Sequence, residues 1–175
     1  YKIYSLSEKG IFVDIEEDQD TFYGNALKKA IEIYELTKEP VIADDSGLCI
    51  TTLDDFPGVF THRYLGEEAT DEDINNDLIE RMINVSDRSA RVVCDLVYYD
   101  GANMLHGKGI INGEIATNIR GENGFGFDPI FQLENGKTLA ELADKEKNEV
   151  SARYIAALNL IEQLKQLEEE EELIF

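Results

Sequence analysis

Residues 90–99 (ARVVCDLVYY) are rich in β-branched and aromatic residues, and this composition predicts a β-strand. The dipeptide that follows, Asp100-Gly101, is typical of a hairpin turn. Residues 105–119 continue as strand, turn and strand, with the second turn predicted at Asn112-Gly113. The second half of the chain therefore predicts long antiparallel hairpins in a sheet.

Further strands and helices are predicted around these hairpins. An alternating stretch at residues 1–6 and short apolar runs at 41–43 and 48–53 predict strands. Apolar residues at helical spacing predict a helix between Thr21 and Pro40, a helix over 70–84, a helical region from 138 and a helix over 151–167. No repeat or linker-like stretch divides the 175 residues, of which 43% are hydrophobic. The chain therefore predicts a single α/β domain, residues 1–175, built on a mixed sheet.

The charge balance narrows the classes of partner. Asp and Glu number 37 against 16 Lys and Arg, which gives a formal net charge of −21. Binding to a nucleic-acid polymer or to an anionic membrane surface requires clustered basic residues, so neither is expected. No apolar run approaches the roughly 18 residues that a membrane-spanning helix needs. Because residues 168–172 are all Glu, we interpret residues 168–175 as a solvated acidic tail.

Cysteine and histidine usage predicts no metal centre. Cys49 and Cys94 lie in apolar, strand-like stretches, which is typical of reduced packing thiols in a cytoplasmic protein. His62 and His106 are neither spaced nor accompanied as a metal site or a catalytic triad would require, so both are expected to be surface or loop residues.

The strongest local signal for chemistry is Asp44-Asp45-Ser46-Gly47, which follows the apolar run 41–43. A strand end exposes side chains to a crevice, and adjacent acids point to opposite sides, so that one can face a site while the other secures the loop. Carboxylates in such a place suit Mg²⁺, which prefers oxygen ligands and keeps several waters. Ser46 offers a hydroxyl and a backbone N–H to an anion. An Asp-rich turn that satisfies its own backbone is an equal alternative for this tetrapeptide alone.

Two other acidic stretches are similar to calcium loops only in composition. Residues 14–20 contain five acids, but Gln19 and Asn25 stand where the turn glycine and the bidentate glutamate of an EF-hand loop belong. The acids at residues 71–77 fail the same spacing and lie on a predicted helix, so we interpret them as a solvated face.

Residues 121–128 (GENGFGFD) form a glycine-rich loop with two phenylalanines. Glycines let the backbone approach a ligand closely, and Phe125 or Phe127 could stack on a flat ring; a structural loop plugged by aromatics is the alternative. The loop fits neither the dinucleotide-binding pattern nor the P-loop pattern. Lys147 and Arg153 flank a predicted helix start and are candidate phosphate ligands, unless they pair with neighbouring acids.

Taken in order, these pieces resemble one known family. The motifs are T-F-x-x-N-A-x-x-K-A (21–30), A-D-D-S-G-L (43–48), P-G-V-F-x-x-R-Y (57–64), D-R-S-A-R (87–91), R-G-E-N-G-F-G-F-D-P-I-F (120–131), and K-T-x-A-E-L with K-N-x-x-S-x-R (137–153). From residue 1 to about 167 the chain is similar to the inosine triphosphate pyrophosphatase family, hydrolases that remove nonstandard purine nucleoside triphosphates from the nucleotide pool.

The resemblance implies a fold and a reaction. The expected fold is an elongated mixed β-sheet flanked by helices in two lobes, with a substrate cleft between them, usually in a homodimer. The expected reaction is the Mg²⁺-dependent cleavage of ITP, dITP or XTP between the α- and β-phosphates, which yields the monophosphate and pyrophosphate.

The resemblance also implies roles for individual residues. Asp45 is the expected general base and a metal ligand, and Ser46 beside it is expected to touch substrate. Glu16 or Glu17 is expected to share the metal. The residues expected to hold the base, followed by two further nucleotide contacts, are Phe125, Gly126, Phe127 and Asp128, then Lys147 and Arg153.

The sequence departs from the family pattern at two places. Family members normally begin with a strand and a T-G-N-x-x-K loop that grips the triphosphate, and Tyr1 aligns after that unit; we therefore expect the sequence to be a fragment that lacks it. The family triplet S-H-R reads Ser151-Ala152-Arg153 in this chain. Because the histidine would assist recognition of the base or the phosphates, turnover or purine selectivity is expected to differ from that of the family. A pyrophosphatase for other modified nucleotides, or a non-catalytic nucleotide-binding or dimerising relative, are the alternative hypotheses.

Overall fold

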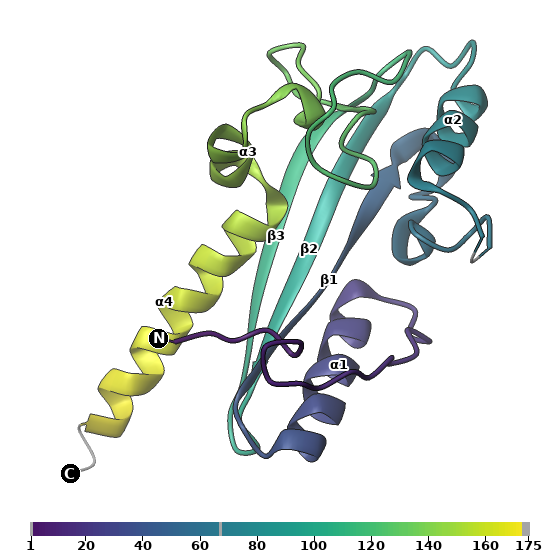
Figure 1. Ribbon diagram of the computed structural model, residues 1–175. Helices are drawn as coiled ribbons and strands as arrows, with labels where there is room; N and C mark the ends of the chain where they lie inside the picture. Colours follow the sequence, from purple (N-terminus) through teal and green to yellow (C-terminus); the bar gives the residue numbers. More distant parts are fainter. Residues whose placement is uncertain (1, 67, 173–175) are drawn as a thin grey trace.

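The computed structural model describes residues 2–66 and 68–172 (Figure 1). Its sheet has the strand order β1 (Val41–Ile50), β2 (Ser89–Tyr99), β3 (Met104–Ile115) and β4 (Phe131–Gln132), and all neighbouring strands pair antiparallel. The helices around it are α1 (Phe22–Thr37), α2 (Asp71–Arg81), α3 (Asp144–Val150) and α4 (Ala152–Glu172). The predicted α/β class is confirmed, whereas the predicted mixed sheet is not found in the described residues, where each strand pair is antiparallel.

Helices α1 and α4 cover opposite faces of the sheet. Side chains alternate between the two faces along a strand, and Val97 of β2 packs on Ala26 and Ala30 of α1. On the other face, a Cβ added to Gly109 of β3 would lie 1.9 Å from the carbonyl oxygen of Ala152 in α4. Only glycine permits so close an approach of helix and strand. The sheet is therefore enclosed between two helices that touch it on different sides.

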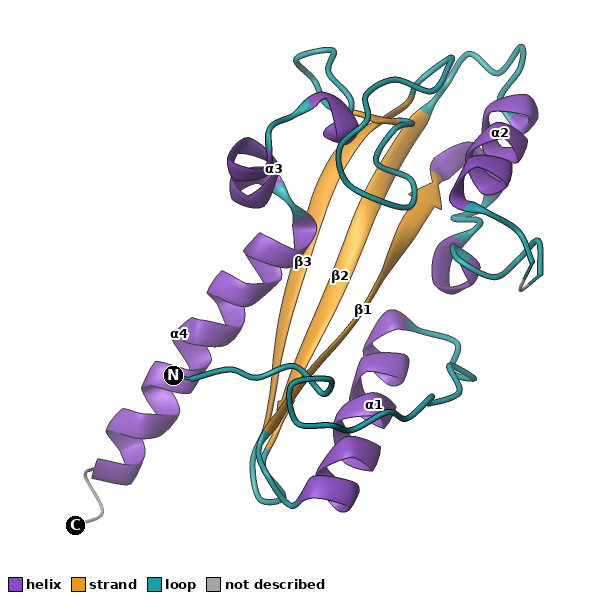
Figure 2. Ribbon diagram, viewed as in Figure 1, coloured by secondary structure: helices purple, strands orange, loops and turns teal. Residues whose placement is uncertain are grey.

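Two hydrophobic clusters follow this division. The larger one joins β1, β2 and β3 to α2, α4 and the loops, and its fully buried members include Leu48, Ile50, Leu78, Met82, Ile130 and Phe131. The smaller one is the contact of α1 with β2. Helices α2 and α3 gather with the loops near one end of the long strands, whereas α1 packs toward the other end (Figure 2). This arrangement leaves the middle of β1 between two packed regions.

Two predicted turns are wrong, and glycine explains both. Residues 44–47 lie inside the continuous strand β1 and not at a strand end. Gly47 is needed there because an added Cβ would lie 2.5 Å from the carbonyl oxygen of Gly58. Gly113 lies inside β3, where an added Cβ would lie 2.4 Å from the carbonyl oxygen of Gln132. Each glycine therefore marks a close approach of backbone and not a change of chain direction.

The strand predicted for residues 1–6 is also wrong for the part that the structure describes. Residues 2–6 belong to no strand, and Ile3 is 75% exposed, so the alternating apolar side chains bury little. The chain then runs beside α1, where Lys28 Nζ donates to the carbonyl oxygen of Glu16 at 2.8 Å. A segment with an alternating pattern forms a strand only where a neighbouring strand is available to pair with it.

The predicted helix starts are confirmed. The Thr21 hydroxyl oxygen accepts a hydrogen bond from the backbone N–H of Gly24, and Thr70 forms a capping box with Asp73. Helix α4 runs past the predicted end at 167 to Glu172, so the acidic tail begins as helix, and residues 173–175 lie outside the described residues. Every helix that the structure describes is too short or too polar to cross a bilayer.

Candidate active site

Asp44 and Asp45 point to opposite faces of β1, as the alternation of side chains in a strand predicts. Asp44 lies on the α4 side, where its carboxylate accepts a hydrogen bond from Arg153 Nη2 at 2.7 Å. Asp45 lies on the α1 side, where Oδ2 accepts one from Asn25 Nδ2 at 2.9 Å. A single strand therefore presents two carboxylates to two different environments.

The Asp45 carboxyl is buried, with 8% of the residue exposed. Burial raises its pKa, because the hydrogen bond from Asn25 and the charge of Lys29 offset only part of the cost of desolvation, and the Glu17 carboxylate adds to the rise. A buried carboxyl with a raised pKa beside a cation is suited to accept a proton from water.

Glu17 comes to the same place from the loop before α1. Lys29 Nζ lies 2.7 Å from Glu17 Oε1 and 3.6 Å from Asp45 Oδ1, so its ammonium group stands between the two carboxylates. Arg63 Nη1 lies 2.5 Å from Glu17 Oε2. Burial pushes the pKa of Glu17 up, but the hydrogen bonds and charges of Lys29 and Arg63 outweigh it and hold this pKa below its usual value. We call Asn25, Lys29, Glu17, Asp45 and Arg63 the carboxylate cluster.

The chemistry of the carboxylate cluster fits a hard divalent cation. The ammonium group of Lys29 lies between the carboxylates of Glu17 and Asp45, so these two side chains together attract a cation. Within residues 2–66 and 68–172, no group of three or more acidic, histidine or cysteine side chains could hold a metal ion. Two carboxylates suit Mg²⁺ in particular, since it is usually held by one or two protein carboxylates and completes its shell with water and substrate phosphates.

Glu16, the other candidate of the acidic loop, does not share the Lys29 cation of Asp45. Its side chain is exposed, and its carbonyl oxygen accepts the hydrogen bond from Lys28. Glu17, in contrast, is half-buried and turned toward α1. Of the two acids, only Glu17 shares a cation with Asp45 in the structure.

A pocket of about 300 Å³ opens on the other face of β1. It brings together every predicted substrate contact except Gly126, and its lining includes Ser46, Phe125, Phe127, Asp128, Lys147 and Arg153. Gly126 lies in the same loop, where its N–H donates to Asp71 and its carbonyl oxygen accepts from Asn75, so that α2 holds the loop in place. We call this cavity the aromatic pocket.

The charges in the aromatic pocket are paired across elements. Lys147 Nζ lies 2.5 Å from Asp128 Oδ2 and 4.6 Å from the centre of the Phe125 ring. Asp128, 4% exposed, also accepts a hydrogen bond from the Phe125 N–H. The alternative that Lys147 and Arg153 pair with their neighbouring acids is not what the structure shows, since their partners are Asp128 and Asp44. A buried carboxylate and a cation beside a ring form a polar wall for a planar ligand.

The carboxylate cluster and the aromatic pocket meet around one edge of β1. This strand is the end of the described sheet, so its two faces are connected around the edge that β2 does not cover. The segment after Gly58 lies along that edge, because the Thr61 hydroxyl accepts a hydrogen bond from the Leu48 N–H at 3.0 Å and donates one to the Gly58 carbonyl. Next to Thr61, His62 lines the aromatic pocket and Arg63 reaches the carboxylate cluster.

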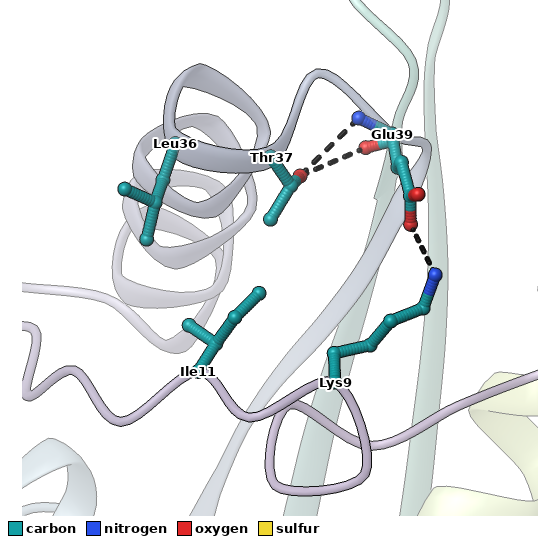
Figure 3. A pocket seen from close by; sticks show the side chains of 5 residues that line it. All are labelled: Lys9, Ile11, Leu36, Thr37 and Glu39. Carbon is teal, nitrogen blue, oxygen red and sulfur yellow. Dashed lines mark hydrogen bonds and ion pairs between the residues drawn. The ribbon is translucent and has the colours of Figure 1, made fainter.

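A second cavity, of about 450 Å³, lies between the N-terminal loop and the end of α1 (Figure 3). Lys9 and Glu39 close one side with an ion pair of 2.8 Å, and the Thr37 hydroxyl donates to a carbonyl of its own helix. Ile11 and Leu36 supply the apolar remainder. Its polar side chains already have partners, so the catalytic candidates remain those around β1.

Comparison with known proteins decides the family. The model of the Ham1 family matches residues 1–163. The chain belongs to the Ham1 family. It is 40% identical over 169 residues to a dITP/XTP pyrophosphatase of Clostridium tetani, covering 94% of this chain and 84% of that protein. It is 43% identical over 174 residues to a dITP/XTP pyrophosphatase of Thermoanaerobacter sp. strain X514, covering 96% and 87%.

Solved Ham1 structures have the same fold. The Staphylococcus aureus Ham1 protein aligns with a TM-score of 0.84 at 36% identity, covering 98% of this chain and 88% of that one. A HAM1 protein from Coxiella burnetii aligns with a TM-score of 0.81 at 41% identity, covering 90% and 81%. The resemblance inferred from the ordered motifs is thereby confirmed.

Sequence reasoning missed several members of this Ham1 site. Asn25 and Lys29 stood in the first quoted motif, and Arg63 in the third, but nothing in one sequence showed that they meet Asp45 and Glu17. His62 lies in a loop as predicted, yet it lines the aromatic pocket. His106 lies in β3 and not in a loop, and its half-buried side chain places Nε2 2.5 Å from the carboxylate of Asp95.

Proposed function

We propose that this Ham1 protein is a nucleoside triphosphate pyrophosphatase that hydrolyses dITP, XTP and ITP to the monophosphate and pyrophosphate. Its similarity to dITP/XTP pyrophosphatases over more than nine-tenths of the chain supports this proposal. The structural observation that carries it is the placement of a buried, cation-bridged carboxylate pair and an aromatic pocket on the two faces of one strand. Such a pair suits the Mg²⁺ that accompanies a polyphosphate, and such a pocket suits a purine.

The aromatic pocket would hold the nucleoside. The loop residues Phe125, Gly126 and Phe127 offer ring faces and close backbone contact to the base. Asp128 and Lys147 would make polar contacts at its edge, and Ser46 and Arg153 would contact the part of the nucleotide that leads toward the β1 edge. Hypoxanthine and xanthine carry an oxo group where adenine carries an amine. A hydrogen-bond donor of the pocket that pairs with this oxygen would have no acceptor when adenine is bound, and a buried donor without an acceptor is costly.

The carboxylate cluster would carry the reaction. Mg²⁺ held by Asp45 and Glu17 would supply charge neutralisation for the phosphates. Asp45 would orient the attacking water and accept its proton as the new P–O bond forms and the bond of the α–β anhydride breaks. Lys29 and Arg63 keep the Glu17 carboxylate ionised, and Asn25 fixes one Asp45 oxygen so that the other faces the cation. Positioning and charge neutralisation are the main contributions that a protein makes to phosphoryl transfer.

Pyrophosphate release from dITP, XTP, ITP and dATP tests the proposal, with full-length protein and Mg²⁺. We expect monophosphate and pyrophosphate in equal amounts and a kcat/KM at least about a hundredfold higher for the oxo-purines than for dATP. No release from any nucleotide would contradict the enzymatic proposal. Equal rates with dATP would contradict the selectivity, and release of orthophosphate would contradict the cleavage position.

Ala152 favours one variation of this function. The family triplet places a histidine at this position, and here a small side chain lines the aromatic pocket instead. A pocket without that imidazole has room for a purine with an additional substituent. The same assay with other modified purine triphosphates tests this alternative, and a higher kcat/KM than for dITP would favour it.

We also propose that the protein forms a homodimer, as the family resemblance implies. Sedimentation equilibrium at micromolar concentration tests this proposal. A mass of one chain across the range would contradict it.

A further inference from the structure

His62 stands on the wall of the aromatic pocket, and the function proposed above gives it no role. The side chain is exposed and lines the cavity together with Phe127 and Lys147. It is not a freely placed loop residue, because the preceding Thr61 is buried and bonded to the backbone of β1. The following Arg63 is tied to Glu17. The backbone on both sides of His62 is thus fixed, and its ring is directed to the pocket.

The imidazole of His62 faces an aromatic partner across the pocket. Its ring lies nearly parallel to that of Phe127, with an angle of 23° between the planes and 6.3 Å between the centroids. Two stacked bases are about 3.4 Å apart, so a planar base between two rings requires a separation of about 6.8 Å. The centroid distance of 6.3 Å is wider than direct stacking of the two rings and shorter than the separation that a base needs, so the rings part by about half an ångström or more to admit one.

The opposite wall of this slot is equally well held. Asn75 and Asp71 of α2 bind the backbone of Gly126, the residue before Phe127. A Cβ added to Gly126 would lie 3.1 Å from His62 Cε1, so a side chain there would shift the imidazole by a few tenths of an ångström. Gly126 also has a positive φ of 58°, which favours glycine for a second reason. The backbone behind both walls is thus held by contacts outside the slot.

We propose that His62 and Phe127 form an aromatic slot that receives the purine base of the substrate, so that His62 is a further specificity-determining residue. Histidine and phenylalanine are both side chains on which proteins stack nucleobases. The inference rests on the proposed function and adds one ligand to it, from a segment that also supplies Arg63 to the carboxylate cluster. Because His62 touches the base and not the phosphates, its contribution is to binding and not to the chemical step.

Steady-state kinetics with dITP and direct binding of dIMP test the slot. We expect His62→Ala to raise KM for dITP and the dissociation constant for dIMP about tenfold while kcat changes less than about threefold. His62→Phe keeps a stacking ring and is expected to restore both values to within about threefold. Leu65→Ala is the matched control, since Leu65 is exposed in the same segment and outside the pocket lining.

The outcomes separate this inference from the function on which it rests. If the unmodified protein hydrolyses dITP and His62→Ala leaves KM and dIMP binding unchanged, the slot is wrong and the function stands. If His62→Ala lowers kcat as much as kcat/KM, His62 acts in the chemical step and the slot is again wrong. If the unmodified protein does not hydrolyse dITP, the proposed function fails, and dIMP binding by the two His62 variants still decides whether the slot exists.

Discussion

The two faces of β1 treat their charged groups in different ways, although Asp44 and Asp45 are neighbours in the chain. On the α1 side, the carboxylate cluster is half-buried to buried, and each of its charges has a partner within the protein. On the α4 side, the aromatic pocket is open, and its ion pairs leave ring faces and cavity volume free. The α1 side thus holds charged groups at fixed positions, where each is neutralised by a partner. The α4 side offers an open cavity that a ligand can fill.

The contrast between the two faces predicts how removal of a side chain acts on each of them. In the carboxylate cluster, the charges act on the stability of the fold as well as on activity, so a substitution changes stability in the direction that the pKa shift of the removed group sets. In the aromatic pocket, loss of a ring or a cation removes contacts to the ligand and affects mainly binding. Four experiments test this contrast, from the largest expected effect to the smallest on activity and stability.

Asp45→Asn is expected to have the largest effect on activity. Loss of the proton acceptor should lower kcat by about two to four orders of magnitude. Stability should not fall, because the pKa of Asp45 is raised in the folded protein and its charged form is therefore a cost to folding that grows as pH rises through that pKa. Thermal unfolding at pH 7.5 beside the kinetic assay measures both, and a clear loss of thermal stability would contradict the assigned burial cost.

Glu17→Gln, compared with Glu16→Gln, resolves which acid of the N-terminal loop serves the metal. Glu17 shares Lys29 with Asp45 and Glu16 does not. We expect Glu17→Gln to raise the Mg²⁺ concentration for half-maximal rate by about ten- to a hundredfold, and Glu16→Gln to change it less than about twofold. Magnesium titrations of pyrophosphate release supply the measurement, and equal effects of the two substitutions would remove Glu17 from the proposed site.

Lys147→Met tests the aromatic pocket in the same way. The substitution removes the cation beside the Phe125 ring and leaves the buried Asp128 without its ion-pair partner. We expect KM for dITP to rise about tenfold with little change in kcat. Lys145→Met is the control, because Lys145 is an exposed lysine of the same helix and lies outside the pocket lining. A fall in kcat with unchanged KM would contradict the division of roles between the two faces.

The smallest effect concerns acid stability. The pKa of Glu17 is held below its usual value of 4.5 in the folded protein, so its ionised form stabilises the fold above pH 4.5 and this contribution disappears as pH falls through the lowered pKa. The stability difference between the unmodified protein and Glu17→Gln should therefore be present at pH 6 and shrink below pH 4.5. Urea unfolding at several pH values measures it, and a difference that is independent of pH would contradict the ion-pair explanation.

Local patterns predicted the elements whose cause is local. Thr21 and Thr70 cap their helices as expected, and the strand from Ser89 to Tyr99 follows from its composition. The turn predicted at Asn112-Gly113 failed because the need for glycine there comes from Gln132 on another strand. The site follows the same rule, since alternation along β1 predicted that Asp44 and Asp45 separate, whereas the contact of Lys29 with Glu17 depends on how a loop lies against a helix.

The contact of Gly109 with α4 links a strand position outside the aromatic pocket to the size of that pocket. The first residues of α4 supply part of the lining, and the distance of this helix from the sheet is set where Gly109 meets the Ala152 carbonyl. A single methyl group at position 109 would displace the helix start, and with it Arg153, from the base of the cavity. The volume of the aromatic pocket therefore depends on a strand position outside its lining.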